Sequence, residues 1–113
     1  MVDCVFCKIA RKEIPAEFIA EDDNFVAFKD INPKAPVHLL IIPKEHFGPV
    51  SSLAAGDSGI LGKMIIKAKE VAEGMKVSSN GYRLIFNVGK DAGMEVSHLH
   101  LHLLAGKLLK FEF

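Results

Sequence analysis

The sequence predicts an α+β fold with a mainly antiparallel sheet of about five strands, one long helix and a short helix near the N-terminus. Three observations support this prediction. Several short apolar runs are bounded by turn-forming residues, which is typical of strands. A single long stretch has helical periodicity. The strands and this helix do not alternate regularly, which argues against βαβ units and a parallel sheet.

The N-terminal part is expected to contain the short helix and three strands. Residues 5–12 have helical character, and this helix must end before Pro15, because the residue preceding a proline is disfavoured in the α region. The segment 30–36 contains two prolines and is expected to be irregular. Apolar runs flanked by turn signals predict strands over residues 17–20, 25–28 and 38–42, the last of which ends at Pro43.

The long helix is expected over residues 57–75, where Gly74 and the turn at 78–81 mark its end. Its charged residues fall largely away from the apolar positions, which recur at helical spacing: Ile60, Leu61, Met64, Ile65, Ala68, Val71, Ala72 and Met75. Two strands should follow, over residues 82–88 and 96–104. The last residues, 111–113, are expected to form either a pairing strand or a dimer contact.

Length and charge limit the classes of function. The 113 residues are expected to form one domain, residues 1–113. Lys plus Arg number 14 and so do Asp plus Glu, so the chain lacks the basic excess of a nucleic-acid binder. The start of the sequence does not resemble a signal peptide, and no apolar run is long enough to cross a membrane. We therefore expect a cytoplasmic protein without nucleic-acid or membrane partners.

Three histidines, His98, His100 and His102, occupy alternate positions of the last predicted strand. They should share one face of that strand, about 6.5–7 Å apart, because side chains alternate between faces. A single histidine there would most simply be structural, but three buried imidazoles would each need a polar partner. Two roles remain open: zinc ligands, or a nucleophile whose neighbours handle protons and phosphate charge. The intervening leucines, Leu99, Leu101 and Leu103, should face the core.

Cys4 and Cys7 form a Cys-x-x-Cys pair close to the N-terminus. In a reducing compartment this spacing indicates half a metal site or a redox pair, and a stable disulfide is not expected. The redox interpretation requires a preceding strand, whereas only three residues precede Cys4. A metal site is therefore favoured.

The run His-apolar-His-apolar-His-apolar-apolar at residues 98–104 resembles the signature of the histidine-triad superfamily, specifically its nucleotide-binding branch. Further segments, residues 6–9, 12–16, 27–36, 38–46 and 81–87, are similar to that family in order and spacing. The resemblance therefore covers nearly the whole chain.

The resemblance implies a hydrolase that cleaves the bond to the α-phosphate of purine nucleoside phosphoramidates or related nucleotides. His100 would be the nucleophile and form a covalent nucleotidyl-histidine intermediate. His102 would contact the phosphate and handle protons, and His38 and Asn87 would assist from adjoining strands. Fixed imidazole and amide donors suit this chemistry, because negative charge develops on the phosphoryl oxygens in the transition state.

The resemblance also implies a nucleoside pocket, in which Asp30 accepts hydrogen bonds from the ribose hydroxyls. Its base-binding residues would be Val5, Phe6, Ile9, Ile31 and Leu40. From the residue pattern alone, ordinary core positions are the simpler interpretation of these apolar residues. An Asx turn is an equally good interpretation of Asp30.

A structural zinc site is the expected role of Cys4, Cys7, His46 and His98, because two thiols and two imidazoles make a closed tetrahedral set. Some bacterial members of the superfamily are similar in this respect, with the first strand histidine binding metal and the middle one performing chemistry. The alternative is that the cysteines are small apolar fillers of the first helix and that His46 is a surface residue.

Met94 and Glu95 depart from the family pattern, in which many relatives have glutamine and serine. Met94 has no donor for a phosphate, and Glu95 would repel one unless it points away or acts as a base. These residues favour an alternative function, a nucleotide-binding regulatory module with little catalysis. A dinucleoside polyphosphate hydrolase is a further alternative, as is a zinc hydrolase whose metal is held by the three strand histidines. The small size and the resemblance lead us to expect a homodimer.

Overall fold

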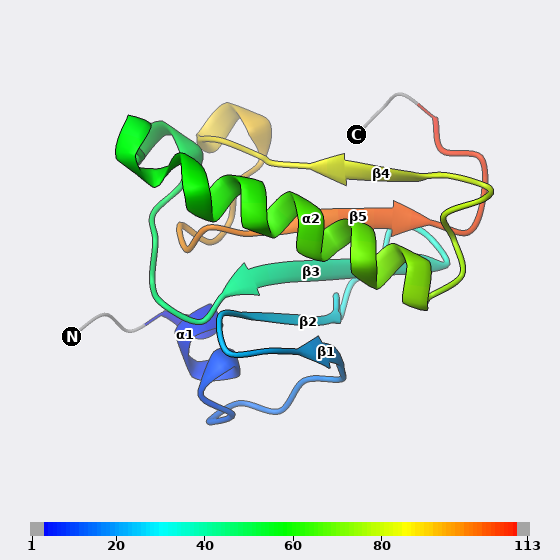
Figure 1. Cartoon of the computed structure of the whole chain (residues 1–113), viewed down its shortest axis with the longest axis horizontal. Coiled ribbons are helices and arrows are strands. Elements are labelled where there is room, and N and C mark those ends of the chain that lie inside the picture. The colour runs from blue at the N-terminus through cyan, green and yellow to red at the C-terminus, as the bar shows by residue number, and fades with distance from the viewer. Residues whose placement is uncertain (1–3, 111–113) are drawn as a thin grey trace.

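The computed structural model describes residues 4–110 and contains one sheet with a helix on either side (Figure 1). The helices are α1 (Val5–Ala10) and α2 (Ser58–Gly74), and three short 3₁₀ turns lie in the loops. The strands are β1 (Phe18–Glu21), β2 (Phe25–Lys29), β3 (Val37–Pro43), β4 (Tyr82–Ile85) and β5 (Leu101–Ala105). These elements confirm the predicted α+β fold.

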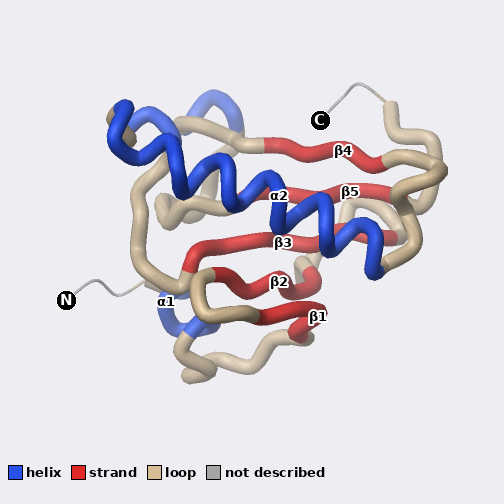
Figure 2. The backbone as a smooth tube through the Cα atoms, in the orientation of Figure 1, coloured by secondary structure: helices blue, strands red, loops and turns tan. Residues whose placement is uncertain are grey.

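The five strands form a fully antiparallel sheet in the order β1-β2-β3-β5-β4 (Figure 2). β3 and β5 are therefore neighbours although 57 residues separate the end of one from the start of the other, Pro43 and Leu101. In their register His38 lies opposite Leu104, and Leu40 lies opposite His102. This pairing brings the histidines of two distant segments to the middle of the sheet.

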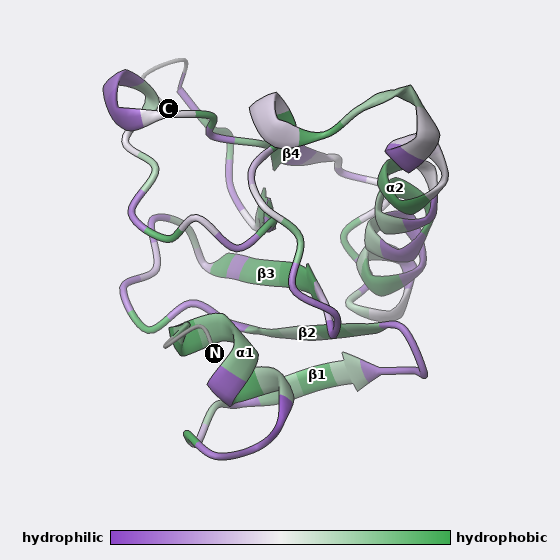
Figure 3. Ribbon diagram, turned by 90° about the vertical axis from the view of Figure 1, so that its left-hand side faces the viewer, coloured by the Kyte–Doolittle hydropathy of each residue, from purple (hydrophilic) through white to green (hydrophobic). Residues whose placement is uncertain are grey.

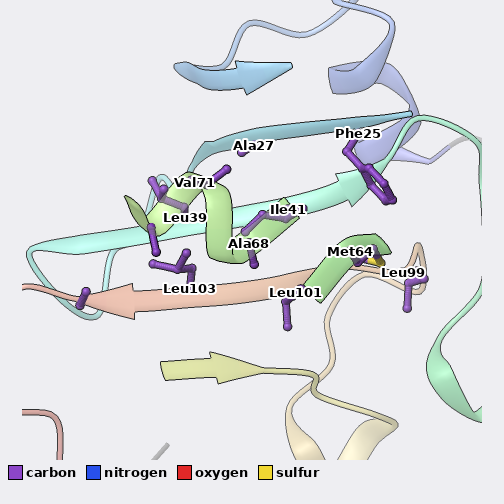
Figure 4. Close-up of a cluster of buried hydrophobic side chains, with 12 residues drawn as sticks. Phe25, Ala27, Leu39, Ile41, Met64, Ala68, Val71, Leu99, Leu101 and Leu103 are labelled. Atoms are coloured by element: carbon purple, nitrogen blue, oxygen red, sulfur yellow. The ribbon is translucent and has the colours of Figure 1, made fainter. Parts of the chain in front are cut away.

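The main core lies between α2 and one face of the sheet (Figure 4). Leu99, Leu101 and Leu103 belong to it, which confirms the predicted core face of the histidine segment. Helix α2 contributes its buried residues Met64, Ala68, Val71 and Ala72, all at helical spacing. Ile65, which the periodicity also assigned to the core, is 45% exposed.

A second apolar cluster lies on the opposite face of the sheet, where α1 packs (Figure 3). Phe6 and Ile9 from α1 belong to this cluster together with alternate residues of β2 and β3, such as Phe28 and Leu40. Strand alternation thus gives each face of the sheet its own core. The histidines share this second face with α1, away from α2.

The strand predicted over residues 96–104 is wrong for its first half, because β5 begins only at Leu101. The reason is at the end of β3. Continuing the ladder beyond the Ile41–Leu101 pair would require Pro43 to donate a hydrogen bond, and proline has no N–H. The carbonyl of Pro43 instead accepts a hydrogen bond from the His98 side chain, at 2.9 Å.

Other element boundaries differ from the predictions by a few residues. Helix α1 ends at Ala10 rather than at residue 12, because Lys12 adopts a positive φ of 63°. Helix α2 ends at Gly74, the glycine that the sequence predicts as its end, and Lys76 just beyond it adopts a positive φ of 62°. β4 ends at Ile85 and not at residue 88. The expectation for residues 111–113 lies outside the described residues.

Within the part of the chain that the structure describes, no helix has the length and apolarity needed to cross a membrane. The cytoplasmic location stays a prediction.

Gly106 directly follows β5 and provides a test of the fold. It has a φ of +98°, and a Cβ at this position would lie 2.8 Å from Cβ of Pro36. We expect Gly106→Ala to lower the free energy of unfolding by about 1–3 kcal/mol, because it adds a strained φ and a steric clash. The matched control is Gly62→Ala within α2, where a Cβ meets nothing within 4 Å. This control should be neutral or stabilising by up to about 1 kcal/mol. Urea denaturation measures both variants, and an unchanged midpoint for Gly106→Ala would contradict the clash.

Candidate functional site

All five histidines of the sequence gather on the α1 side of the sheet. They form two groups. In the first, the His102 ring centroid lies 5.2 Å from those of both His38 and His100. In the second, the His46 and His98 rings are 4.8 Å apart and meet edge to face. His98 and His100 therefore face different centres although only one residue separates them.

The protonation of His100 follows from its hydrogen bond to the main chain. Its Nδ1 lies 2.7 Å from the carbonyl oxygen of His98. A carbonyl oxygen can only accept, so Nδ1 must carry the hydrogen, and in the neutral ring Nε2 carries the lone pair. Burial lowers the pKa of His100, which is 9% exposed, and the neutral form predominates at neutral pH. His100 thus presents a nucleophilic Nε2.

The protonation of His102 follows from a chain of hydrogen bonds that begins at the backbone N–H of Lys34 and passes through His38. The N–H of Lys34 donates to Nδ1 of His38 at 3.0 Å, so the proton of the neutral His38 ring is on Nε2. That Nε2 lies 2.9 Å from Nδ1 of His102 and donates to it. The proton of neutral His102 is consequently on Nε2. His100 and His102, adjacent on one face, therefore present opposite groups: one lone pair and one N–H donor.

Burial also gives the site a pH dependence. It lowers the pKa of His102 from 6.5 to about 4, with smaller contributions from the nearby His100 and His38 and an opposing one from Asp30. His102 is harder to protonate in the folded protein than in the unfolded chain. The contribution of neutral His102 to the free energy of unfolding is therefore fully present above pH 6.5 and is lost as the pH falls towards 4.

We expect the free energy of unfolding to fall over this pH range, with His102 contributing on the order of 3 kcal/mol at most. His102→Asn removes this contribution, so the variant should lose less stability between pH 6.5 and 4 than the wild type. Urea denaturation of both proteins at matched zinc concentration measures the difference. Parallel pH profiles for the two proteins would contradict the prediction.

Asp30 connects the first histidine group to the loop after β2. Its Oδ1 accepts a hydrogen bond from the N–H of Asn32 at 2.8 Å, which is the Asx turn considered from the sequence. Its Oδ2 lies 3.4 Å from Nε2 of His38. These two residues and His102 place ligand-type atoms within 4.8 Å of one another. A cation would nevertheless need a lone pair on Nε2 of His38, and that atom carries the proton, so this cluster is a hydrogen-bonded chain.

Some of the residues expected to bind the base are buried, and others are exposed. Phe6, Ile9 and Leu40 are buried together in the α1 cluster, and the Phe6 ring lies edge-on to His100 with centroids 5.1 Å apart. Val5 is 41% exposed, and Ile31 is 90% exposed. The structure thus places Phe6 beside His100 and leaves Val5 and Ile31 exposed to solvent.

Asn87 lies just beyond the end of β4 and lines a small hollow together with Met94, His98 and His100. This places Asn87 in the same hollow as His100. Met94 offers no donor in that hollow. Glu95 is exposed.

The four predicted metal ligands come together in a second cluster. The Sγ atoms of Cys4 and Cys7 each lie 3.4 Å from Nδ1 of His98, and Sγ of Cys7 lies 3.2 Å from Nδ1 of His46. All four ligand atoms are within 4.8 Å of one another. A tetrahedral zinc ion with its usual bond lengths requires sulfur–nitrogen separations of about 3.5 Å. The donor set and its spacing therefore fit a metal ion.

The protonation states in this cluster also suit a metal. The Nε2 of His98 donates to the carbonyl of Pro43, which leaves the lone pair on the Nδ1 that faces the thiols. Burial lowers the pKa of His98 to about 4, so the ring is neutral, as a ligand must be. Burial raises the pKa of the Cys7 thiol, with Cys4 adding to the effect, and a bound cation would displace that proton.

Sequence reasoning missed the backbone groups of this site. The N–H of Lys34 and the carbonyls of Pro43 and His98 set the protonation of three histidines. No side-chain motif signals such groups. The two prolines flanking Lys34, at positions 33 and 36, are the only hint of a constrained loop there.

The sequence matches, over residues 3–110, the family described as scavenger mRNA decapping enzyme C-term binding. Protein HitA of Neisseria gonorrhoeae is 48% identical over 104 residues, which are 92% of this chain and 96% of that protein. The purine nucleoside phosphoramidase of Escherichia coli K12 is 43% identical over 107 residues, covering 95% of this chain and 90% of that protein.

Solved structures agree with these matches. A histidine triad protein from Clostridium difficile superimposes with a TM-score of 0.94 at 41% identity, covering 97% of this chain and 96% of that one. A HIT family hydrolase from Legionella pneumophila also gives a TM-score of 0.94, at 48% identity over 97% of this chain and 98% of that one. The prediction drawn from residues 98–104 is thereby confirmed: the chain belongs to the histidine-triad superfamily.

Proposed function

We propose that the protein is a nucleotide hydrolase that cleaves the bond to the α-phosphate of purine nucleoside phosphoramidates, with His100 as the nucleophile. The hydrogen bond from Nδ1 of His100 to the carbonyl of His98 carries this proposal, because it places the lone pair on Nε2. The relatives named as a purine nucleoside phosphoramidase and a HIT family hydrolase support the substrate class and the reaction type.

The reaction proceeds in two displacements at phosphorus. Nε2 of His100 attacks the α-phosphorus and forms a new N–P bond, while the P–N bond to the amine breaks and the amine takes a proton from solvent water. Water then attacks the same phosphorus, the bond between His100 and phosphorus breaks, and the nucleoside monophosphate leaves. The attacking water returns a proton to solvent, so the proton count closes. The Nε2–H of His102 donates to a phosphoryl oxygen in both steps and stabilises the charge that develops there.

His38, Asp30 and Asn87 support these two imidazoles. His38 keeps the proton of His102 on Nε2 through the 2.9 Å hydrogen bond. Asn87 donates to the phosphate through its side-chain amide, a role supported by the hollow that it lines together with His100. Asp30, adjacent to the exposed Ile31, accepts from the ribose hydroxyls.

The nucleoside base lies against α1 and the loop after β2. Phe6 and Ile9 form the inner wall with Leu40, and Val5 and Ile31 cover the base from outside. The high exposure of Ile31, 90%, supports this placement, because a bound base would remove that apolar side chain from water.

Incubation with adenosine 5′-phosphoramidate tests the proposal directly. We expect steady release of AMP, together with a protein species heavier by one AMP residue that is trapped by an alkaline quench during turnover, because the N–P bond of such an intermediate hydrolyses in acid. Binding of AMP without turnover would favour a regulatory module, the alternative that Met94 suggests. Faster cleavage of a diadenosine polyphosphate than of the phosphoramidate would favour a dinucleoside polyphosphate hydrolase.

We propose that the cluster of Cys4, Cys7, His46 and His98 holds a structural zinc ion. The two sulfur and two nitrogen donors support zinc over harder cations, and the closed set leaves no position for substrate. All chemistry at phosphorus is therefore assigned to the first histidine group.

We also propose that the protein is a homodimer. β4 pairs only with β5 among the described strands, so one of its edges is open, and Ile66 of α2 is 55% exposed. Sedimentation equilibrium should give twice the mass of one chain, and a monomer at micromolar concentration would contradict this.

A further inference from the structure

His98 contacts both histidine groups, through its side chain in one and its main chain in the other. Its side chain faces the two thiols, and its main-chain carbonyl accepts the hydrogen bond that orients His100. From this double role we infer that the metal ion held by the Cys4/Cys7/His46/His98 cluster positions the nucleophile, so that nucleotide turnover depends on metal occupancy. The inference rests on the proposed function, since it requires both the metal and the role of His100.

The first connection between the two sites runs through the main chain. Residue 98 precedes β5, whose pairing with β3 begins at Leu101, so the sheet ladder does not hold its carbonyl. Nearby, the N–H of Leu99 donates to the carbonyl of Phe47 at 2.7 Å, and the ring of His98 contacts both cysteines and Pro43. The position of the His98 carbonyl therefore depends on what its side chain binds, and a change there moves the partner of His100 Nδ1.

The second connection runs through α1. This helix has six residues, which is too few to be stable without tertiary contacts. Cys4 caps it and Cys7 lies one turn later, so two of the four metal ligands hold it to the sheet. Between them is Phe6, whose ring lies edge-on to both His98 and His100, at centroid distances of 6.0 and 5.1 Å. Fixing α1 therefore also fixes the wall against which His100 packs.

The metal would join three segments that the sheet does not join: α1, the loop after β3 that carries His46, and the segment that carries His98. Without an ion, the four ligand side chains are held to one another by sulfur–nitrogen contacts of 3.2–3.4 Å, and thiols form weak hydrogen bonds. With zinc they share bonds of about 2.0–2.3 Å. None of the four ligands contacts the reacting phosphorus, so they act as positioning residues.

The experiment uses the full chain with ¹⁵N-labelled histidine. Bound metal is first removed with a chelator, and zinc chloride is then the probe. Three quantities are followed during zinc titration: the Nδ1–H signal of His100, the affinity for AMP, and AMP release from adenosine 5′-phosphoramidate. The variant His46→Asn removes an exposed ligand that lies outside the first histidine group. His46→Cys restores a soft ligand, and Glu45→Gln, at the next position in the same exposed loop, is the matched control.

We expect zinc to restore the His100 signal and to raise kcat/KM at least 10-fold in the stripped wild type, in His46→Cys and in Glu45→Gln, but not in His46→Asn. A stripped protein that keeps the signal and full turnover would overturn the inference. So would an absence of zinc binding, or a loss of the amide signals of β3 and β5 on stripping, because the ion would then hold the whole fold. If zinc restores the His100 signal but no form releases AMP, the proposed function fails while the coupling stands.

Discussion

Replacing His100 by alanine is expected to lower kcat for adenosine 5′-phosphoramidate by at least about 10³-fold while changing the affinity for AMP by less than about 10-fold. The variant removes the nucleophilic Nε2, and neither His102 nor His38 can take its place. The proton of His102 lies on Nε2, and the ring of His38 donates to His102. The nucleotide contacts assigned to Asp30 and α1 remain, so binding should survive.

Steady-state kinetics and calorimetric titration with AMP separate these two effects. Ser97→Ala is the control, because it changes an exposed residue of the same segment and should leave both quantities unaltered. His100→Asn keeps a polar side chain and should be equally inactive. A His100 variant that turns over normally but no longer binds AMP would reverse the assignment and make His100 a binding residue.

Cys7→Ser is expected to abolish stoichiometric zinc binding and to lower the free energy of unfolding in the presence of zinc by at least about 3 kcal/mol. Sγ of Cys7 lies within 3.4 Å of both ligand histidines, so its loss removes the donor that joins them. A metal that binds the folded chain and not the unfolded one stabilises the fold by its binding free energy, and a serine hydroxyl is a poor ligand for zinc.

Metal analysis of the purified proteins and urea denaturation, with zinc and with a chelator, measure this effect. The stabilities of the wild type and Cys7→Ser should differ in zinc and converge in chelator, because serine is nearly isosteric with cysteine. Wild-type protein that contains no zinc and gains no stability from it would remove the basis for the metal site.

The sequence predicted those parts of the structure that arise from local periodicity. Alternation placed Leu99, Leu101 and Leu103 in the core and the histidines on the opposite face, and helical spacing located α2. The expected spacing of about 6.5–7 Å along the strand also separated His98 from His100. The structure places these two residues at different centres. The four potential metal ligands were recognised by residue type, because thiols and imidazoles in a small set have few other uses.

The remaining features depend on contacts between distant segments. β5 begins late because Pro43, more than fifty positions earlier in the chain, lies where a donor would be needed. The protonation of His38 depends on which peptide group the loop after β2 turns towards it. The resemblance alone makes Ile31 a pocket residue, and no sequence pattern indicates its exposure of 90%. Such properties belong to the folded chain and have no local signature.

The N–H of Lys34 illustrates a wider consequence for anyone who wants to move this chemistry to another scaffold. The side chain of Lys34 is exposed, and the hydrogen bond to His38 uses only its backbone N–H, which every residue except proline supplies. If the histidines were grafted by themselves, each ring could adopt either tautomer. A transferred site must also reproduce the backbone geometry around positions 34, 43 and 98, because the peptide groups there fix which ring nitrogen carries the proton.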